Sequence, residues 1–138
     1  MSPDEHRSRV LELVDRVINA HDAGAIAEFT SSAAIQATVR SLLEAFPDLH
    51  QEIRWIVAED DRVVAFVEMS GTHEGPWLMV QEPTHRRMQA SLMLAFQFGA
   101  DGMIIDSWLG TNFIAMLAQL GWGVAPIGEP VPDPGTGS

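Results

Sequence analysis

The segment 96–121, FQFGADGMIIDSWLGTNFIAMLAQLG, constrains the fold of this chain more than any other stretch. Two apolar runs flank Asp101-Gly102, and an Asp-Gly pair between apolar runs is a strong β-hairpin signal, because glycine readily adopts the positive φ of a tight turn. The second run, 103–109, has the length of a strand, and the residues after it have helical spacing. The segment therefore predicts an antiparallel hairpin followed by a helix.

A single acidic residue, Asp106, lies inside the second strand of this hairpin. Because side chains alternate along a strand, we expect Asp106 to share a buried face with Ile104 and Trp108. Desolvation favours the neutral form of a buried carboxyl, which makes Asp106 a candidate general acid or base. The structural alternative is a carboxylate paired with an arginine or with a backbone amide.

The rest of the chain changes from a helical to a strand-like period near Pro47. A capping sequence at Ser2-Pro3 and apolar residues at helical spacing predict a first helix, and two more helices are expected before Pro47. Alternation then predicts strands at 51–58, 62–70 and 87–98, with Ile53, Trp55 and Val57 on one face of the first.

Helices followed by antiparallel strands and a last helix are typical of an α+β fold. We expect one domain over residues 1–121, with the N-terminal helices packed on a curved, mostly antiparallel sheet, and an irregular Pro/Gly-rich tail at 122–138. Helices over one face of such a sheet enclose a conical cavity. The opposite face of the sheet is then free to pair with a second subunit, which predicts a homodimer.

Composition narrows the classes of partner. The net charge of −11 argues against nucleic acid and anionic membranes as partners, and no run is long enough to cross a bilayer. The chain has no cysteine and no opening segment typical of a signal peptide, so we expect a cytoplasmic protein. No His and carboxylate side chains occur at ligand spacing, so no metal site is predicted.

The balance of large apolar side chains indicates an apolar cavity. The chain has four tryptophans and seven methionines but no tyrosine; flat indoles suit an elongated unsaturated ligand, and methionines adapt to irregular shapes. Ordinary core and interface packing is the alternative for each residue taken alone. The predicted ligand-binding residues are Trp55, Val67, Met69, His73, Trp77, Met88, Leu92, Leu94 and Trp108.

Five stretches together resemble the SnoaL-like polyketide cyclases, within the cone-shaped α+β superfamily named for nuclear transport factor two. They occur in the family's order and cover roughly residues 46–121. The stretches are Phe46-Pro47-Asp48-Leu49, Asp61-Arg62-Val63-Val64, Gly71-Thr72-His73-Glu74-Gly75, Pro83-Thr84 with Arg86-Arg87, and Asp101-Gly102 through Trp108 to Gln119-Leu120-Gly121.

The resemblance implies a cofactor-free enzyme that holds a polyketide-type intermediate in the cone and promotes ring closure. Asp106 matches the acidic position that exchanges protons in the family's aldol cyclases. Two positions depart from the family pattern: Ser107 replaces a histidine before Trp108, and Asn112 replaces an aspartate four residues after it. The acid/base set is thus reduced to one carboxylate, which favours shape-driven closure over aldol chemistry.

Two further residues have competing interpretations. Asn112 is a candidate for orienting a substrate carbonyl, and the alternative is the N-cap of the last helix. His73 is a candidate acid/base group at the rim, and the alternative is a loop histidine with one backbone hydrogen bond. The predicted function is a polyketide cyclase, of aldol or cycloaddition type. An epoxide hydrolase or hydratase of the same superfamily and a non-catalytic binding module remain as alternatives.

Overall fold

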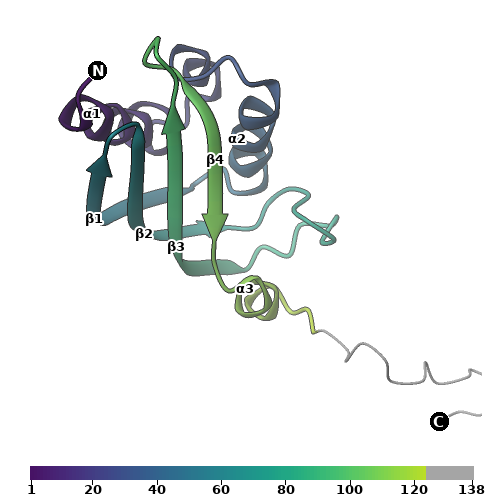
Figure 1. Ribbon diagram of the computed structural model, residues 1–138. Coiled ribbons are helices and arrows are strands. Elements are labelled where there is room, and N and C mark those ends of the chain that lie inside the picture. Colours follow the sequence, from purple (N-terminus) through teal and green to yellow (C-terminus); the bar gives the residue numbers. More distant parts are fainter. Residues whose placement is uncertain (124–138) are drawn as a thin grey trace, which may run out of the picture.

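The computed structural model describes residues 1–123, and these form an α+β fold in which helices cover one face of a curved antiparallel sheet (Figure 1). The sheet has four strands in the order β1-β2-β3-β4, so that β1 and β4 are its edges. The predicted fold class is confirmed. Most of the tail predicted at 122–138 lies outside the described residues. The elements are α1 (Pro3–Leu13), a π-helix η1 (Val14–Asn19), a 3-10 helix η2 (Ala23–Glu28), α2 (Ala33–Ala45), β1 (His50–Glu59), β2 (Arg62–Thr72), β3 (Arg87–Phe98), β4 (Ile104–Gly110) and α3 (Phe113–Gln119).

The first helix begins where the sequence predicts. The Ser2 hydroxyl accepts the Glu5 N–H at 3.2 Å, and the Ser2 N–H donates to the Glu5 carboxylate at 3.1 Å, which completes a capping box with Pro3 at the first turn. The helix continues into the π-helix η1, which ends at Asn19. Wider turns of this kind occur often at functional sites because they redirect side chains.

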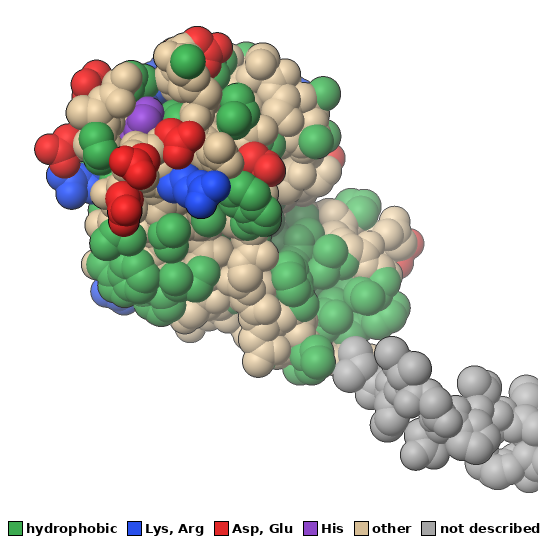
Figure 2. All heavy atoms as spheres, viewed as in Figure 1, with side chains coloured by type: hydrophobic (Ala, Val, Ile, Leu, Met, Phe, Trp, Pro, Cys, Tyr) green, Lys and Arg blue, Asp and Glu red, His purple; other side chains and the backbone are tan. Residues whose placement is uncertain are grey.

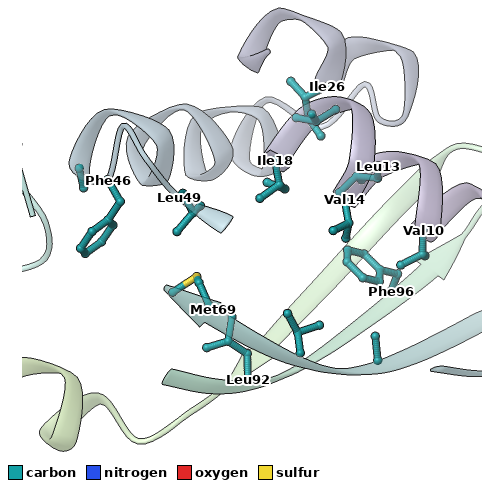
Figure 3. Close-up of a cluster of buried hydrophobic side chains, with 14 of the residues drawn as sticks. Val10, Leu13, Val14, Ile18, Ile26, Phe46, Leu49, Met69, Leu92 and Phe96 are labelled. Carbon is teal, nitrogen blue, oxygen red and sulfur yellow. The ribbon is translucent and has the colours of Figure 1, made fainter. Parts of the chain in front are cut away.

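The core lies between the helices and one face of the sheet, which we call the concave face. Val10, Leu13 and Val14 point from the first helical segment toward the sheet, and Met69 and Leu92 rise from the strands (Figure 3). The concave face continues along β2 through alternate buried residues, from Val63 to Met69. In contrast, most apolar residues of α2 are only half-buried: they pack against the edge of the core, and several of them border a cavity.

The hairpin that closes the sheet has the predicted turn. Gly102 has a φ of 79°, and the Asp101 carboxylate accepts the Met103 N–H at 3.0 Å. At the other end of the sheet, the Asp48 carboxylate accepts the Thr72 N–H at 2.6 Å and the Thr72 hydroxyl at 2.8 Å. Burial raises the pKa of Asp48, but these hydrogen bonds outweigh it and hold the pKa below its ordinary value.

Two β-bulges interrupt the strict alternation of side chains. In β1 the pairing shifts between Ile53 and Trp55, and in β4 residue Ile105 has no partner between the pairs Phe98–Ile104 and Gln97–Asp106. A bulge adds one residue to a strand and therefore moves every later side chain to the opposite face. Among the described residues, no helix is both long and apolar enough to cross a bilayer.

Candidate functional site

An apolar cavity lies between α2 and the concave face of the sheet, and it has two adjacent lobes. We call the first the loop-side lobe, because the loop after β2 and the helix α3 form its far wall; its volume is about 420 Å³. Apolar side chains contribute most of its surface. Its lining residues are Thr38, Ser41, Leu42, Met69, Pro76, Trp77, Leu78, Leu92, Leu109, Phe113 and Met116.

The second lobe, which we call the helix-side lobe, has a volume of about 240 Å³ and extends toward the N-terminal helices. Thr38, Leu42 and Leu109 line both lobes, so the two spaces are adjacent beneath the middle of α2. The lining residues are Leu13, Ile18, Ile26, Ile35, Thr38, Val39, Leu42, Gln51, Leu94, Phe96, Ser107, Trp108 and Leu109.

Polar groups in this lining are few and uncharged. The Thr38 hydroxyl donates to the Ala34 carbonyl at 3.0 Å and is thus engaged within α2. The other polar side chains of the lining are Ser41, Gln51 and Ser107, together with the indole N–H groups of Trp77 and Trp108. Neither lobe is lined by an aspartate, glutamate, histidine, lysine or arginine. Within residues 1–123 there is also no cluster of three side chains suited to a metal ion. The cavity therefore offers shape, apolar contact and a few neutral hydrogen-bonding groups.

Gln51 is the most deeply buried of these polar residues, with 4% of its surface exposed. Its Oε1 has no hydrogen-bond partner among the described residues, and its Nε2 donates only to the Met69 sulfur at 3.6 Å. Its backbone, by contrast, is held on both sides: Asn19 Oδ1 accepts the Gln51 N–H at 2.8 Å, and Asn19 Nδ2 donates to the Gln51 carbonyl at 2.9 Å. The end of the π-helix thus fixes the strand that carries Gln51.

Trp77 forms an aromatic wall of the loop-side lobe, in agreement with its predicted place in the cavity. Its ring meets that of Phe46 edge-on at 5.5 Å between centroids and lies 6.4 Å from that of Phe113. Such contacts hold large rings in defined positions. Trp77 is half-buried, so one part of the indole remains available to a ligand.

His73 is fully buried, and the structure does not place it at the rim of the cavity. Its Nδ1 lies 3.1 Å from the backbone nitrogen of Thr84 and 3.0 Å from the Thr84 Oγ1, so the loop that carries Thr84 holds the ring. The ring lies 5.8 Å from Phe46, and Nε2 has no partner among the described residues. His73 lines neither lobe, so the interpretation of His73 as an acid/base group at the rim of the cavity is wrong.

The predicted burial of Asp106 is wrong. The bulge at Ile105 turns Asp106 to the convex face of the sheet, where it pairs with Gln97 and is exposed. Its carboxylate accepts the N–H of its neighbour Ser107 at 2.9 Å. The residue that faces the cavity in its place is Ser107, which pairs with the buried Phe96.

Trp108 follows Asp106 onto the convex face. It pairs with Ala95 and is 51% exposed; although it borders the helix-side lobe, the strand register places its indole outside. Trp55 is displaced in the same way by the bulge in β1: it stacks on Phe66 at 5.7 Å and is 47% exposed. Trp55 lines neither lobe, whereas Trp108 borders the helix-side lobe from an exposed position.

Asn112 caps α3, as its structural alternative predicts. Its Oδ1 accepts the Ala115 N–H at 3.0 Å, and the residue is exposed. It lines neither lobe. The side chain is therefore committed to starting the helix.

Five predicted binding residues do meet at the cavity: Met69, Trp77 and Leu92 in the loop-side lobe, and Leu94 and Trp108 in the helix-side lobe. Val67 and Met88 belong to the fully buried core and line neither lobe. The sequence analysis missed Gln51 and Ser107. Gln51 could have been found from the sequence, because it lies two residues before Ile53 and therefore on the same, otherwise apolar, face of the strand.

Fold and cavity together define a cone-shaped α+β protein with an apolar pocket between helices and sheet. The family model described as SnoaL-like polyketide cyclase matches residues 4–120, so the chain belongs to this family. A comparison with curated proteins found no match.

Several solved structures share the fold. AclR from Streptomyces galilaeus, a proposed hydroxylase, is 31% identical over 87% of this chain and 98% of its own, with a TM-score of 0.73. A proposed SnoaL-like polyketide cyclase from Jannaschia sp. CCS1 is 25% identical over 87% of this chain and 95% of its own, with a TM-score of 0.71. IdmH from Streptomyces antibioticus, a proposed polyketide cyclase, is 21% identical over 85% of this chain and 99% of its own, with a TM-score of 0.65. This similarity indicates a shared fold alone.

Proposed function

We propose that this protein is a cyclase that closes a ring within a polyketide-type intermediate by holding it in a bent, reactive shape. The observation that carries the proposal is the two-lobed apolar cavity, whose described lining contains no ionisable side chain. Family membership supports the same class of reaction. Holding reacting carbons together removes much of the entropic part of a barrier, and this effect alone supplies several kcal/mol, up to about 7–11 kcal/mol in the best-oriented cases.

The absence of a carboxylate or imidazole from the described lining favours closure without proton transfer from a side chain. Aldol closure needs a general base within hydrogen-bond reach of the enolising carbon. Asp106 is on the convex face and His73 lies outside both lobes, so neither has that position. A cycloaddition, in which bonds reorganise within the folded substrate, needs only the correct shape and apolar surroundings.

A second candidate function is favoured by the 31% identity to AclR, a proposed hydroxylase. The two reactions differ in their products: a cycloaddition gives an isomer of the substrate, whereas hydroxylation, which consumes O2 and a two-electron reductant and releases water, adds one oxygen atom. Mass spectrometry of the product separates them directly.

The protein is further proposed to be a homodimer that pairs through the convex face of its sheet. Trp55, Val57, Met93 and Trp108 are each at least 40% exposed there. Hydrophobic side chains gather over the lower parts of β1 and β2 in Figure 2, beneath charged residues near the hairpin between these strands. Exposed apolar patches of this kind are typical of subunit interfaces. Trp55→Glu is expected to shift the protein from dimer to monomer in analytical ultracentrifugation, and an unchanged mass would contradict the pairing.

The cyclase proposal is tested with two linear model substrates, a triene-enone that closes slowly by intramolecular cycloaddition and a diketone that closes by aldol condensation. The protein is expected to accelerate the first and not the second. Leu42→Trp, which fills the junction of the two lobes, is expected to abolish the acceleration. Leu11→Trp makes the same change at an exposed position of α1 and serves as the matched control.

Acceleration that survives in Leu42→Trp would place the reaction outside the cavity and contradict the proposal. Acceleration of the diketone alone would favour an aldol mechanism. Binding of both substrates without any acceleration would identify a binding module.

A further inference from the structure

The apolar cavity is open to solvent along one side. Thr38 and Ser41, on α2, line the loop-side lobe and are exposed. Leu78 on the loop, Leu109 on β4 and Phe113 on α3 line the same lobe, and at least 40% of each side chain is exposed. We call the opening between these five residues the mouth. Contiguous apolar rims of this kind are usually covered by a partner or by another part of the chain.

The helix beside the mouth has an uncovered apolar face as well. α3 contains no charged residue; Met116 and Leu117 are buried, whereas Phe113 and Ile114 are 40% and 62% exposed. In Figure 2 hydrophobic side chains gather over the part of the molecule that contains α3 and the loop after β2. A helix that is apolar all round is normally buried all round, so the outward face of α3 is expected to have a partner.

The turn that carries Leu78 keeps apolar side chains at the mouth at a conformational cost. Trp77 and Val80 exchange two N–H to carbonyl hydrogen bonds of 2.9 Å around Leu78 and Met79. Leu78 has a φ of 52°, a left-handed conformation that is unfavourable for a residue with a branched side chain. Both turn residues are about half exposed. Backbone strain of this kind is concentrated at binding segments, which is consistent with an apolar tip that contacts a partner.

The chain itself supplies a segment that begins beside the mouth. Gly121 has a φ of 89°, and the Trp122 N–H donates to the Leu117 carbonyl at 2.9 Å, an arrangement that ends α3 and reverses the direction of the chain. Residues 124–138, VAPIGEPVPDPGTGS, follow directly. They lie outside the described residues, and they begin one short helix away from Phe113 at the mouth.

The composition of the 124–138 segment suits an aromatic-lined opening. The segment combines Val124, Ile127 and Val131 with four prolines. Proline-rich segments favour the polyproline II conformation, and grooves lined by aromatic rings recognise them in that form. The rings of Trp77 and Phe113 lie 6.4 Å apart between centroids, and both are partly accessible.

The length and the charge of the segment also agree with docking at the mouth. Fifteen residues in polyproline II span about 46 Å, whereas the 13 residues of α2, along which the mouth runs, span about 20 Å. The charged residues of the segment, Glu129 and Asp133, are acidic, and neither lobe is lined by an acidic side chain that would repel them. At the start of the segment the Arg86 guanidinium lies against Gly121, where an added Cβ would be 3.2 Å from Cζ.

We propose that the 124–138 segment docks on its own subunit across the mouth and covers the cavity, with Ile127 and Val131 against the exposed surfaces of Trp77 and Phe113. The segment then shields the apolar rim and the outward face of α3 from water. Ligands enter and leave when it lifts. This proposal concerns the mouth and is independent of the reaction that the cavity promotes.

The test uses the full chain without ligand. Since the chain has no cysteine, Gly135→Cys creates a single attachment site for a nitroxide spin label on the segment. Paramagnetic broadening is expected for the methyl groups of Leu78 and Leu109 at the mouth, but not for those of Leu11 on α1 or Val57 on β1. Similar broadening of all four residues, or broadening of none, would overturn the proposal.

A variant of the segment tests whether apolar contact holds it. Ile127→Asn, made in the spin-labelled chain, is expected to lower the equilibrium constant for docking about tenfold, and the broadening at Leu78 and Leu109 should weaken accordingly. Ile105→Asn makes the same change at an exposed position of β4 and is the matched control, which should leave the broadening unchanged. Unaltered broadening in Ile127→Asn would contradict apolar docking of the segment.

Mixing experiments decide whether the segment docks on its own subunit or on a second copy. Spin-labelled chains without isotope are mixed with isotope-labelled chains that carry no nitroxide. No broadening at Leu78 and Leu109 is expected in the mixture, and broadening that appears there would assign the mouth to a second copy and overturn docking within one subunit. Because none of these measurements involves turnover, a negative result leaves the proposed cyclase function untouched, and failure of the cyclase assay leaves this proposal untouched.

Discussion

Replacing Gln51 by methionine is expected to make the protein more stable. The substitution removes a buried amide whose Oε1 has no partner, and it sacrifices only the contact between Nε2 and the Met69 sulfur. Removing a buried unsatisfied acceptor stabilises a protein by about 1–3 kcal/mol, and the loss of the weak contact with the Met69 sulfur reduces this gain. We therefore expect the free energy of unfolding to rise by about 1 kcal/mol, and the melting temperature by about 4 °C for a chain of this size.

The assay is urea unfolding followed by tryptophan fluorescence at neutral pH, without ligand. Gln97→Met removes an amide whose Nε2 reaches Asp61 at 3.5 Å on the convex face, and as the matched control it should change the free energy of unfolding by no more than about 0.5 kcal/mol. A loss of more than about 1 kcal/mol in Gln51→Met would refute the reasoning, because it would mean that the carboxamide is satisfied in the folded protein.

Three further predictions address residues outside the cavity. Asp106→Asn should leave the rate of ring closure within about twofold, because the carboxylate is exposed on the convex face; a loss of a hundredfold or more would restore it as a general base. Asn112→Ala should lower the free energy of unfolding by about 1 kcal/mol through loss of the α3 cap, measured by urea unfolding, without changing product identity. The pKa of Asp48 is lower folded than unfolded, so its stabilisation is present at neutral pH and is lost as the pH falls through the folded pKa. The stability difference between the unsubstituted protein and Asp48→Asn should accordingly disappear in acid, and a difference independent of pH would contradict this assignment.

The elements of this fold follow from local sequence rules. The capping box at Ser2, the Asp101-Gly102 turn and the alternation along β3 each act over a few residues, and each is found where it was expected. The family resemblance drawn from short motifs agrees with the family model over residues 4–120. Local signals of this kind are reliable because the backbone chemistry that produces them is independent of distant parts of the chain.

The site was harder to predict because the face that a side chain occupies depends on strand register. One unpaired residue in β4, Ile105, is enough to exchange Asp106 for Ser107 in the cavity, and the bulge in β1 moves Trp55 outside in the same way. Bulges are decided by pairing with a neighbouring strand, which the sequence of one strand does not reveal. Gln51 lies before the bulge in β1, so its place on the concave face follows from simple alternation with Ile53.

The most direct test of the central claim is the location of a bound apolar ligand. In methyl NMR spectra of the protein saturated with β-naphthol, intermolecular NOEs are expected to the methyl groups of Leu42, Leu94 and Leu109, which line the cavity. Val57 and Val64, on the convex face, should give none. NOEs to Val57 and Val64 without any to Leu42 would show that ligands bind elsewhere and would contradict the assignment of the cavity as the functional site.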